Sequence, residues 1–400
     1  MLPLMGQLHA NYTFPGDGMV ELTEEALRIH MESLVIDGHS DVADKILKKG
    51  LASRPDFSLN NPQPELDTDI PRLRKGGVDA QVWVAYVSPD YIYTGGGHKA
   101  CLEQIDLIHN LAEMHSGSLE LATSASDIER ITSQGKIAPL IGVEGGHAIE
   151  HSLDKLREYR KRGAIYMTLT HNGTHDWADA SYDKAQHGGL SSFGEEVVLE
   201  MNRLGMLVDI SHASDDTVRD ALKISKAPII ASHSSARAIC GTRRNLSDDL
   251  IRGIADKGGL VMVNFFPLFI APEGAAIEQN YIDKLNEYKK LHPSPQAYNE
   301  ALAKWEKEQP PMPACSVNDV VDHIEHVIET AGIDHVGLGS DYDGILYGPD
   351  QMPDVSGFPY ITQVLLNRGY SKTELKKILG GNFMRALTEA ERQASVSPEA

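Results

Sequence analysis

Eight short apolar runs, rich in β-branched residues, recur along the chain and alternate with segments of helical pattern. This alternation is typical of βαβ units and therefore of a parallel sheet. The runs contain few polar residues, as expected for strands that are buried on both faces. We expect strands near residues 34–39, 79–87, 137–143, 164–170, 206–211, 228–232, 260–265 and 335–340.

The segments between these runs predict the helices that complete eight strand–helix units. The expected helices cover residues 98–115, 152–162, 193–204, 214–224, 247–257 and 317–331. An open doubly wound sheet would more naturally carry a glycine-rich phosphate loop after its first strand, and DGHSD at 37–41 is not such a loop. We therefore predict an α/β fold, a distorted (β/α)8 TIM-like barrel.

Two stretches fall outside this repeat. Residues 271–313 are polar, helix-prone and bounded by prolines, and they lie between the seventh and eighth strands. We expect them to form a helical insert over the barrel mouth, with a surface elaboration or an oligomer contact as the equal alternative. Ser371 and Glu374 predict a capping box near the C-terminus. The whole is expected to be one domain over 1–392 with a frayed tail over 393–400.

Composition narrows the class of protein. With 41% hydrophobic residues the chain can bury a full core. Its formal net charge of -20 repels phosphate backbones, so we expect no nucleic-acid partner. Three widely separated cysteines predict free buried thiols rather than disulfides. No apolar run is long enough to span a membrane, and residues 1–18 do not resemble a signal peptide. We expect a soluble protein without a membrane anchor, in the cytoplasm or the periplasm.

Polar side chains able to bind metal or move protons follow most of the predicted strands. In chain order they are His39 and Asp41, Glu144, His171, His212, His233 and Asp341. The C-terminal ends of the strands of a parallel barrel converge on one mouth. We therefore expect these residues to share a single site.

Five of these residues predict a two-metal centre. His39 and Asp41 are two apart and so point to the same side of an extended segment, where imidazole and carboxylate suit zinc or a similar ion. Glu144 ends an apolar run, where an unpaired charge is costly, and its two oxygens can bridge two cations. His212 and His233 end neighbouring strands and complete the second site. A water between the ions would ionise near neutral pH. A turn cap at Asp41 and a salt bridge from Glu144 to an arginine are the structural alternatives.

Two further residues are assigned to the substrate. His171 is predicted to polarise the scissile carbonyl or to stabilise the oxyanion, with metal ligation as the alternative. Asp341 is predicted to accept the proton of the attacking water and to deliver it to the leaving amine. Asp343 competes for that role, although it also fits a turn before Gly344.

Arg243 and Arg244 follow the sixth strand. A planar guanidinium at the mouth suits a carboxylate and would select a substrate with a free C-terminal acid. Ion pairs with Asp248 and Asp249 on the next helix are an equally open alternative.

Other polar and aromatic residues are expected to be structural. His323 and His326, three apart in a helical segment, are expected to line a solvated face. Trp177 and Tyr182 could shape a wall of the substrate site, but packing within their loop is the simpler expectation.

The chain resembles membrane (renal) dipeptidase and its bacterial relatives, within the metal-dependent amidohydrolase superfamily. The resemblance rests on six segments in the family's order: DGHSD at 37–41, GVEGGH at 142–147, MTLTHN at 167–172, DISH at 209–212, SHSSARAICGTRRN at 232–245 and GLGSDYDG at 337–344. It implies two Zn²⁺ ions per chain, with other divalent ions as alternatives, held by His39, Asp41, bridging Glu144, His212 and His233. It also implies that His171 and Asp341 handle the substrate and that Arg244, rather than Arg243, binds the terminal carboxylate.

These observations together predict a zinc-dependent dipeptidase in which a metal-bridging hydroxide attacks the peptide bond of dipeptides with a free C-terminal carboxylate. Tolerance of a D-residue at the C-terminal position is implied by the resemblance alone. The alternatives are another binuclear amidohydrolase, acting on a cyclic or β-lactam-like amide or another small amide or ester, and more remotely a non-catalytic scaffold. A homodimer is expected. The mammalian relatives carry disulfides and a lipid anchor signal, which the sequence does not lead us to expect here.

Overall fold

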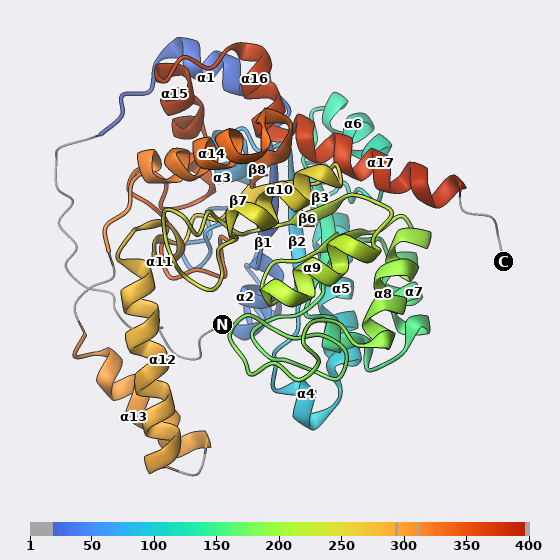
Figure 1. Cartoon of the computed structure of the whole chain (residues 1–400). Helices are drawn as coiled ribbons and strands as arrows, with labels where there is room; N and C mark the ends of the chain where they lie inside the picture. Colours follow the sequence, from blue (N-terminus) through green and yellow to red (C-terminus); the bar gives the residue numbers. More distant parts are fainter. Residues whose placement is uncertain (1–18, 293–294, 310–312, 397–400) are drawn as a thin grey trace.

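Eight parallel strands form a closed barrel in chain order, and β8 pairs with β1 to complete the ring (Figure 1). The structure is a computed structural model that describes residues 19–292, 295–309 and 313–396. The strands are β1 (Ile36–Ser40), β2 (Ala80–Tyr86), β3 (Ala138–Glu144), β4 (Ala164–Thr168), β5 (Leu207–Asp209), β6 (Ile229–Ala231), β7 (Leu260–Val263) and β8 (Val336–Leu338). Each overlaps a predicted strand, so the barrel is confirmed. The segment at 1–18, examined as a signal peptide, lies outside the described residues.

The helices surround this barrel. They are α1 (Glu24–Met31), α2 (Val42–Lys48), α3 (Ile70–Lys75), α4 (Tyr91–Thr94), α5 (Gly97–Met114), α6 (Ala125–Ser133), α7 (Leu153–Lys161), α8 (Ser192–Arg203), α9 (Asp215–Ile224), α10 (Asp248–Asp256), α11 (Pro267–Ile270), α12 (Gly274–Leu291), α13 (Pro295–Glu306), α14 (Val317–Ala331), α15 (Pro359–Asn367), α16 (Lys372–Lys376) and α17 (Asn382–Val396). The six predicted helices are α5, α7, α8, α9, α10 and α14. Serine caps fix several starts, such as Ser214 before α9 and Ser371 of the predicted capping box before α16.

The floor of the barrel is closed by helix α17. Barrel residues such as Ile36 and Leu140 belong to one apolar cluster with Phe383 and Leu387 of this helix. Figure 1 places α17 at the end of the barrel away from the long loop that follows β4. The helix continues to Val396, beyond the boundary expected at 392, and residues 397–400 lie outside the described part of the chain. Because apolar packing closes this end of the barrel, a site can form only at the opposite end, where the strands have their C-terminal ends.

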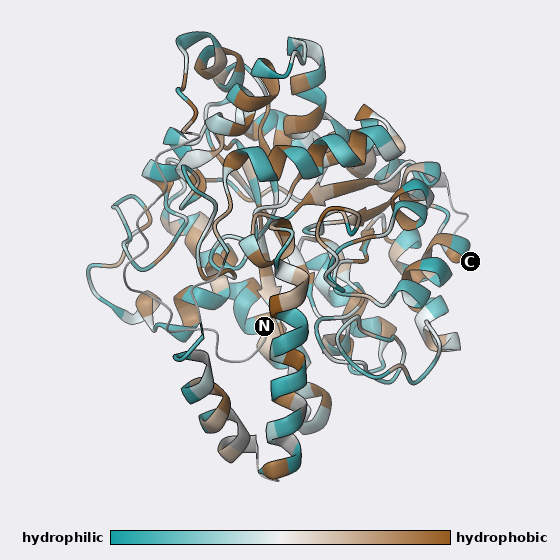
Figure 2. Ribbon diagram, turned by 60° about the vertical axis from the view of Figure 1, so that its left-hand side comes forward, coloured by the Kyte–Doolittle hydropathy of each residue, from teal (hydrophilic) through white to brown (hydrophobic). Residues whose placement is uncertain are grey.

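The insertion between β7 and β8 is helical, as predicted, and its two long helices form a hairpin, while its role over the barrel mouth stays a prediction. Figures 1 and 2 show α12 and α13 as an arm that stands out from the barrel, with hydrophilic and hydrophobic residues intermixed along it. The rings of Tyr281 and Trp305, 6.3 Å apart between centroids, pack the two helices together. The base of the arm is buried at Glu278, whereas Leu291 near its tip is 62% exposed. Residues 293–294 and 310–312 of the predicted insert lie outside the described residues.

The expectation of a solvated face at His323 is wrong. Its side chain is fully buried, with Nδ1 accepting the backbone N–H of Ala236 at 3.0 Å and Nε2 donating to the carbonyl of Ile270 at 3.0 Å. Helix α14 packs this face against the loops after β6 and β7, a contact that helical spacing does not reveal. His326 is partly buried, and its Nε2 lies 2.8 Å from Oδ1 of Asp248.

Two predictions from composition can be compared with the described residues. The cysteines at 101, 240 and 315 are free and buried, as expected. Within the described ranges, none of the helices is both long enough and apolar enough to cross a membrane.

Candidate metal centre and substrate pocket

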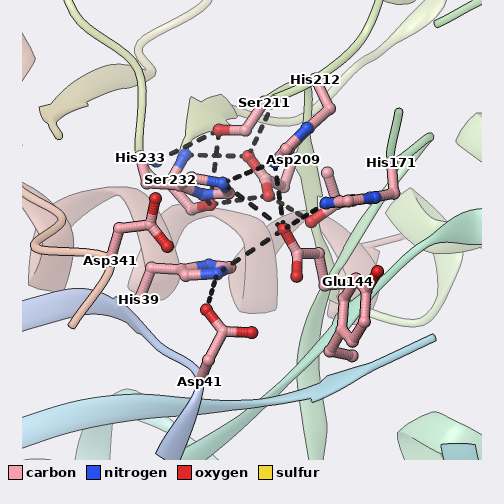
Figure 3. Close-up of polar contacts among 12 residues, drawn as sticks. His39, Asp41, Glu144, His171, Asp209, Ser211, His212, Ser232, His233 and Asp341 are labelled. Carbon is pink, nitrogen blue, oxygen red and sulfur yellow. Dashed lines mark hydrogen bonds and ion pairs between the residues drawn. The ribbon is translucent and has the colours of Figure 1, made fainter. Parts of the chain in front are cut away.

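The residues predicted for the site gather at the C-terminal mouth of the barrel (Figure 3). His39 lies in β1, Asp41 directly follows it, and Glu144 is the last residue of β3. The other side chains come from the loops that directly follow β4, β5, β6 and β8. Seven of them point toward one another in Figure 3: His39, Asp41, Glu144, His171, His212, His233 and Asp341. The convergence of parallel strand ends therefore brings together residues that are far apart in sequence.

Glu144 is at the centre of this cluster. Its Oε1 lies 3.1 Å from Nε2 of His212 and 3.5 Å from Nε2 of His233. The Nε2 atoms of His39 and His171 lie 3.7 and 3.9 Å from the same oxygen. Because Glu144 is only 3% exposed, its charge must be balanced inside the cluster.

Three overlapping groups of side chains have ligand atoms close enough to hold a metal ion, within 4.8 Å of one another. They are His39, Glu144 and His233; Glu144, His171 and His212; and His39, Asp41 and Asp341. Glu144 and His39 are each shared by two groups, so the cluster is continuous. The groups combine the predicted ligands differently from the sequence prediction, and they add His171 and Asp341 as neighbours.

Nδ1 of His39 is hydrogen-bonded, and this bond leaves Nε2 as the nitrogen that can bind a metal ion. Nδ1 lies 3.1 Å from the hydroxyl oxygen of Tyr166, which donates its own proton to the carbonyl of Gly38 at 3.0 Å. Nδ1 of His39 must therefore be the donor, and Nε2 is the nitrogen that faces the cluster and can offer a lone pair to a cation that displaces its proton. Among the described residues this buried Nε2 has no hydrogen-bond partner.

The same logic applies to His233 and His212. Nδ1 of His233 lies 2.7 Å from the hydroxyl oxygen of Ser232, which donates to Asp209 at 2.7 Å. Nδ1 of His212 lies 2.8 Å from Oδ1 of Asn172, which can only accept. Both Nε2 atoms thus carry lone pairs, and they lie 2.9 Å apart. Two lone pairs at this distance repel unless a cation or a proton stands between them, so the donor set fits a metal centre.

The pKa shifts within the cluster also fit a metal centre. Burial raises the pKa of Glu144 to about 8 and that of Asp341 to about 7. Burial lowers the pKa of His39, but the carboxylates of Glu144 and Asp41 outweigh this effect and raise it to about 10. Burial holds the pKa of the other three imidazoles well below the usual value, so they are neutral. Neutral imidazoles beside carboxylates that are costly to ionise form a site that a cation would stabilise.

The backbone at the mouth is unusual at two of the candidate site residues. His212 and Asp341 adopt φ values of 67° and 64°, in the left-handed region that non-glycine residues seldom occupy. Gly344 lies against the second of them, because a Cβ at this position would lie 2.1 Å from Oδ2 of Asp41 and 2.7 Å from Oδ1 of Asp341. The glycine therefore allows two carboxylates to approach the same point.

A pocket adjoins the cluster, and Arg244 lies on its wall. Arg244 is 2% exposed, and its guanidinium group donates to neutral partners, Ser234 Oγ at 3.2 Å and the carbonyl of His233 at 3.0 Å. Its Nε meets no hydrogen-bond acceptor among the described residues. Burial lowers the pKa of Arg244, yet the group remains a cation that is set against the pocket.

The contacts of the neighbouring charged residues bear on the alternatives that the sequence left open. Asp249 pairs with Arg219 at 3.2 Å, and Asp248 pairs with His326. Neither aspartate therefore forms the ion pair with Arg244 that was the alternative. Asp343 is buried and pairs with Lys45 at 3.2 Å, and its φ of 70° precedes Gly344. Asp343 is therefore a turn residue, whereas Asp341 lines the pocket.

Several pocket residues were not singled out from the sequence as functional. Asp44 and Lys48 form an ion pair at 2.6 Å on α2, and both line the pocket. Their four-residue spacing just after Asp41 could have predicted this ion pair on one face of a helix beside the site. Asn264 donates to Oδ2 of Asp341 at 2.9 Å, and its position directly after the apolar run of β7 was the same signal that marked the other site residues. Tyr182, for which loop packing was the simpler expectation, also lines the pocket.

Comparison with known proteins places the chain among dipeptidases. The family model for membrane dipeptidase (peptidase family M19) matches residues 23–400. Dipeptidase 3 of Macaca fascicularis is 34% identical over 378 residues, which are 93% of this chain and 68% of the relative. Dipeptidase aclJ of Aspergillus oryzae is 35% identical over 372 residues, which are 90% of this chain and 78% of the relative.

Solved structures share the fold. The probable dipeptidase PvdM from Pseudomonas aeruginosa superposes with a TM-score of 0.79 at 24% identity, covering 93% of this chain and 98% of its own. A metallopeptidase from Rhodobacter sphaeroides, solved with a phosphinate mimic of the dipeptide L-Ala-D-Ala, gives a TM-score of 0.73 at 21% identity, covering 90% and 100%. This chain belongs to the membrane dipeptidase family, peptidase family M19, and is a metal-dependent dipeptidase.

Proposed function

We propose that this protein is a binuclear zinc dipeptidase that hydrolyses dipeptides with a free C-terminal carboxylate. The observation that carries the substrate class is the buried guanidinium of Arg244 on the pocket wall, which donates only to neutral partners among the described residues. A buried cation of this kind is stabilised by an anionic ligand, and its planar fork suits a carboxylate. Of the cluster, Asp41, Glu144, His171, His212 and Asp341 line the same pocket.

For the metal centre, we assign His39, Asp41 and Glu144 to one ion and Glu144, His212 and His233 to the other. The 2.9 Å separation of the Nε2 atoms of His212 and His233 supports their sharing one ion. Imidazole and carboxylate ligands in this proportion suit zinc. When bound, the two ions supply an activated water and polarise the scissile carbonyl.

Asp341 is the proposed proton carrier. Its pKa, raised to about 7 by burial, lets the carboxyl group take up and release a proton near neutral pH. Asn264, donating to Oδ2 at 2.9 Å, fixes one oxygen of this group and does not engage Oδ1. Asp341 can therefore accept the proton of the attacking water and return it to the leaving amine.

His171 is the proposed stabiliser of the developing oxyanion. The side chain is 4% exposed, and burial holds its pKa well below the usual value, so the ring stays neutral. A neutral imidazole that lines the pocket can donate one hydrogen bond to the carbonyl oxygen without first losing a proton.

The stereochemistry and assembly are also part of the proposal. The Rhodobacter sphaeroides metallopeptidase of similar fold was solved with a mimic of an L,D dipeptide, which supports acceptance of a D-residue at the C-terminal position. We further expect a homodimer, which sedimentation velocity would test.

The decisive experiment combines metal analysis of the purified protein with a screen of L,L and L,D dipeptides. We expect two equivalents of zinc in the active protein and cleavage of free dipeptides. Matched dipeptide amides, which lack the C-terminal charge, should be cleaved far more slowly. Full activity with fewer than two equivalents would contradict the binuclear centre, and equal cleavage of amides or a preference for cyclic amides would favour another amidohydrolase reaction.

A further inference from the structure

The arm between β7 and β8 reaches the substrate pocket through one buried carboxylate. Glu278, in the second turn of α12, is 3% exposed. Its Oε1 accepts a hydrogen bond from the hydroxyl of Tyr182, and its Oε2 accepts the backbone N–H of Arg243 at 3.1 Å. A buried carboxylate requires such partners, so both contacts are part of how the base of the arm is held.

Both partners of Glu278 adjoin groups that serve the pocket. Tyr182 lines the pocket, and the residue before it, Ser181, donates its N–H to the carbonyl of His212 at 2.8 Å. Arg243 directly precedes Arg244, which lines the same pocket. Glu278 therefore connects the loop after β4 with the loop after β6 across the substrate site.

We propose that Glu278 is a positioning residue that fixes Tyr182 relative to Arg244 and thereby sets the space for the C-terminal residue of the substrate. This inference rests on the proposed function, in which Arg244 binds the C-terminal carboxylate. Tyr182 then forms the side wall beside that residue, with its hydroxyl committed to Glu278 and its ring left to the pocket.

The chemistry of the pair supports a fixed wall. Burial and the carboxylate of Glu278 raise the pKa of Tyr182 well above its usual value, so the hydroxyl remains a donor at neutral pH. The second oxygen of Glu278 is occupied by the N–H of Arg243, so the carboxylate cannot turn toward the substrate without losing a bond. Neither oxygen bonds a residue of the Glu144 cluster, so we expect an effect on binding and not on the chemical step.

The first test is Glu278→Ala. With both acceptors removed, the KM for a cleaved dipeptide should rise about 5- to 20-fold, as expected for two lost hydrogen bonds, while kcat stays within about twofold. The Kd of a phosphinate dipeptide analogue should rise by the same factor, which provides a reading independent of turnover. The preference between small and large C-terminal residues should also narrow.

Matched variants separate positioning from folding. Glu278→Gln preserves the shape, with its oxygen facing Arg243 and its amide donating to Tyr182, so KM should stay near the wild-type value. Tyr182→Phe removes only the hydroxyl. In the double variant with Glu278→Ala, the rise in KM should be smaller than the product of the two single rises. Lys284→Ala, on the same helix and in a pair with Glu287 at 2.7 Å, should change neither parameter.

An unchanged KM and analogue Kd in Glu278→Ala, in a wild type that cleaves dipeptides, would overturn the positioning role alone. If Glu278→Ala does not fold, Tyr182→Phe carries the same test, with an expected rise in KM of about 3- to 10-fold. If the wild type cleaves no dipeptide, the proposed function fails and this inference fails with it.

Discussion

Gly142 of β3 faces the ring of Tyr166 so closely that a Cβ there would lie 2.5 Å from the ring carbon Cζ. The glycine gives the phenol room to cross the barrel interior and to meet Nδ1 of His39. A residue in the core of the barrel thus fixes the tautomer of an imidazole at its mouth. Packing and site chemistry are coupled at this point.

Tyr166→Phe should therefore weaken metal binding without leaving a cavity in the core of the barrel. The ring still fills the space beside Gly142, but His39 loses the acceptor for its Nδ1 proton. We expect the metal affinity to fall about 10- to 100-fold, measured by competition with a chromophoric chelator. Tyr159→Phe is the matched control, because this buried tyrosine of α7 donates to the carbonyl of Ala148 at 2.8 Å and should affect stability alone. Equal affinities in the two variants would contradict the prediction.

The two adjacent arginines should differ sharply. Arg244→Lys retains the charge but loses the planar fork, so the KM for dipeptides should rise about 10- to 100-fold with a smaller change in kcat. Arg243→Lys should be nearly neutral, because Arg243 contacts Glu278 through its backbone N–H. Steady-state kinetics of both variants on one dipeptide provide the comparison, and a similar KM for both would argue against a carboxylate site at Arg244.

The two aspartates of the last loop should also separate. Asp341→Asn cannot carry a proton, so kcat should fall about 10²- to 10⁴-fold while the fold is retained. Asp343→Asn removes one of the two carboxylates that pair with Lys45, the other being Asp67, and should lower the free energy of unfolding with little effect on kcat. Urea unfolding and single-substrate kinetics distinguish the two outcomes. A large kcat loss in Asp343→Asn would reverse the assignment.

Acid should destabilise the protein through buried histidines. Burial lowers the pKa of His323 to about 4, against about 6.5 in an unfolded chain. Between these values the unfolded state binds a proton that the folded state does not, so stability is full above about pH 6.5 and falls as pH decreases. The free energy of unfolding of metal-free protein should drop by about 2 kcal/mol between pH 7.5 and 5 from this residue alone.

His323→Asn isolates this contribution, since asparagine offers an oxygen to the N–H of Ala236 and does not titrate. His30 and His147, whose pKa values burial also lowers to about 4, remain in the variant and retain their share of the slope. We expect the variant to be less stable at pH 7.5 but to lose about 2 kcal/mol less on acidification. Parallel pH profiles for the two proteins would refute the assignment.

The strands and the ring of polar residues were predictable because both follow from local sequence. A buried parallel strand needs a continuous apolar run, and a polar residue that ends such a run lies at the mouth by topology alone. Glu144 shows this most clearly, since its run is apolar up to the carboxylate. The six predicted helices were recognised from the same local periodicity.

What escaped prediction depends on contacts between distant segments. The burial of His323 arises from the packing of α14 on the loop that contains Ala236, and nothing in the spacing of the helix indicates it. The bond between Tyr182 and Glu278 joins an irregular loop to an insertion, where no periodicity restricts partners. Asp209 and Ser232 orient His233 from adjacent strand ends, but short polar residues there fit turns equally well.

The seam between the first and last strands has a consequence for how the protein matures. Asp37 in β1 pairs with Leu338 in β8, and the backbone N–H of Asp341 bonds the carbonyl of His39 at 3.1 Å. A ribosome must therefore synthesise most of the polypeptide before the ion-binding rim can assemble. We expect metal capture to lag behind helix formation during refolding, and a stopped-flow measurement with a metal indicator would time the closure of this seam.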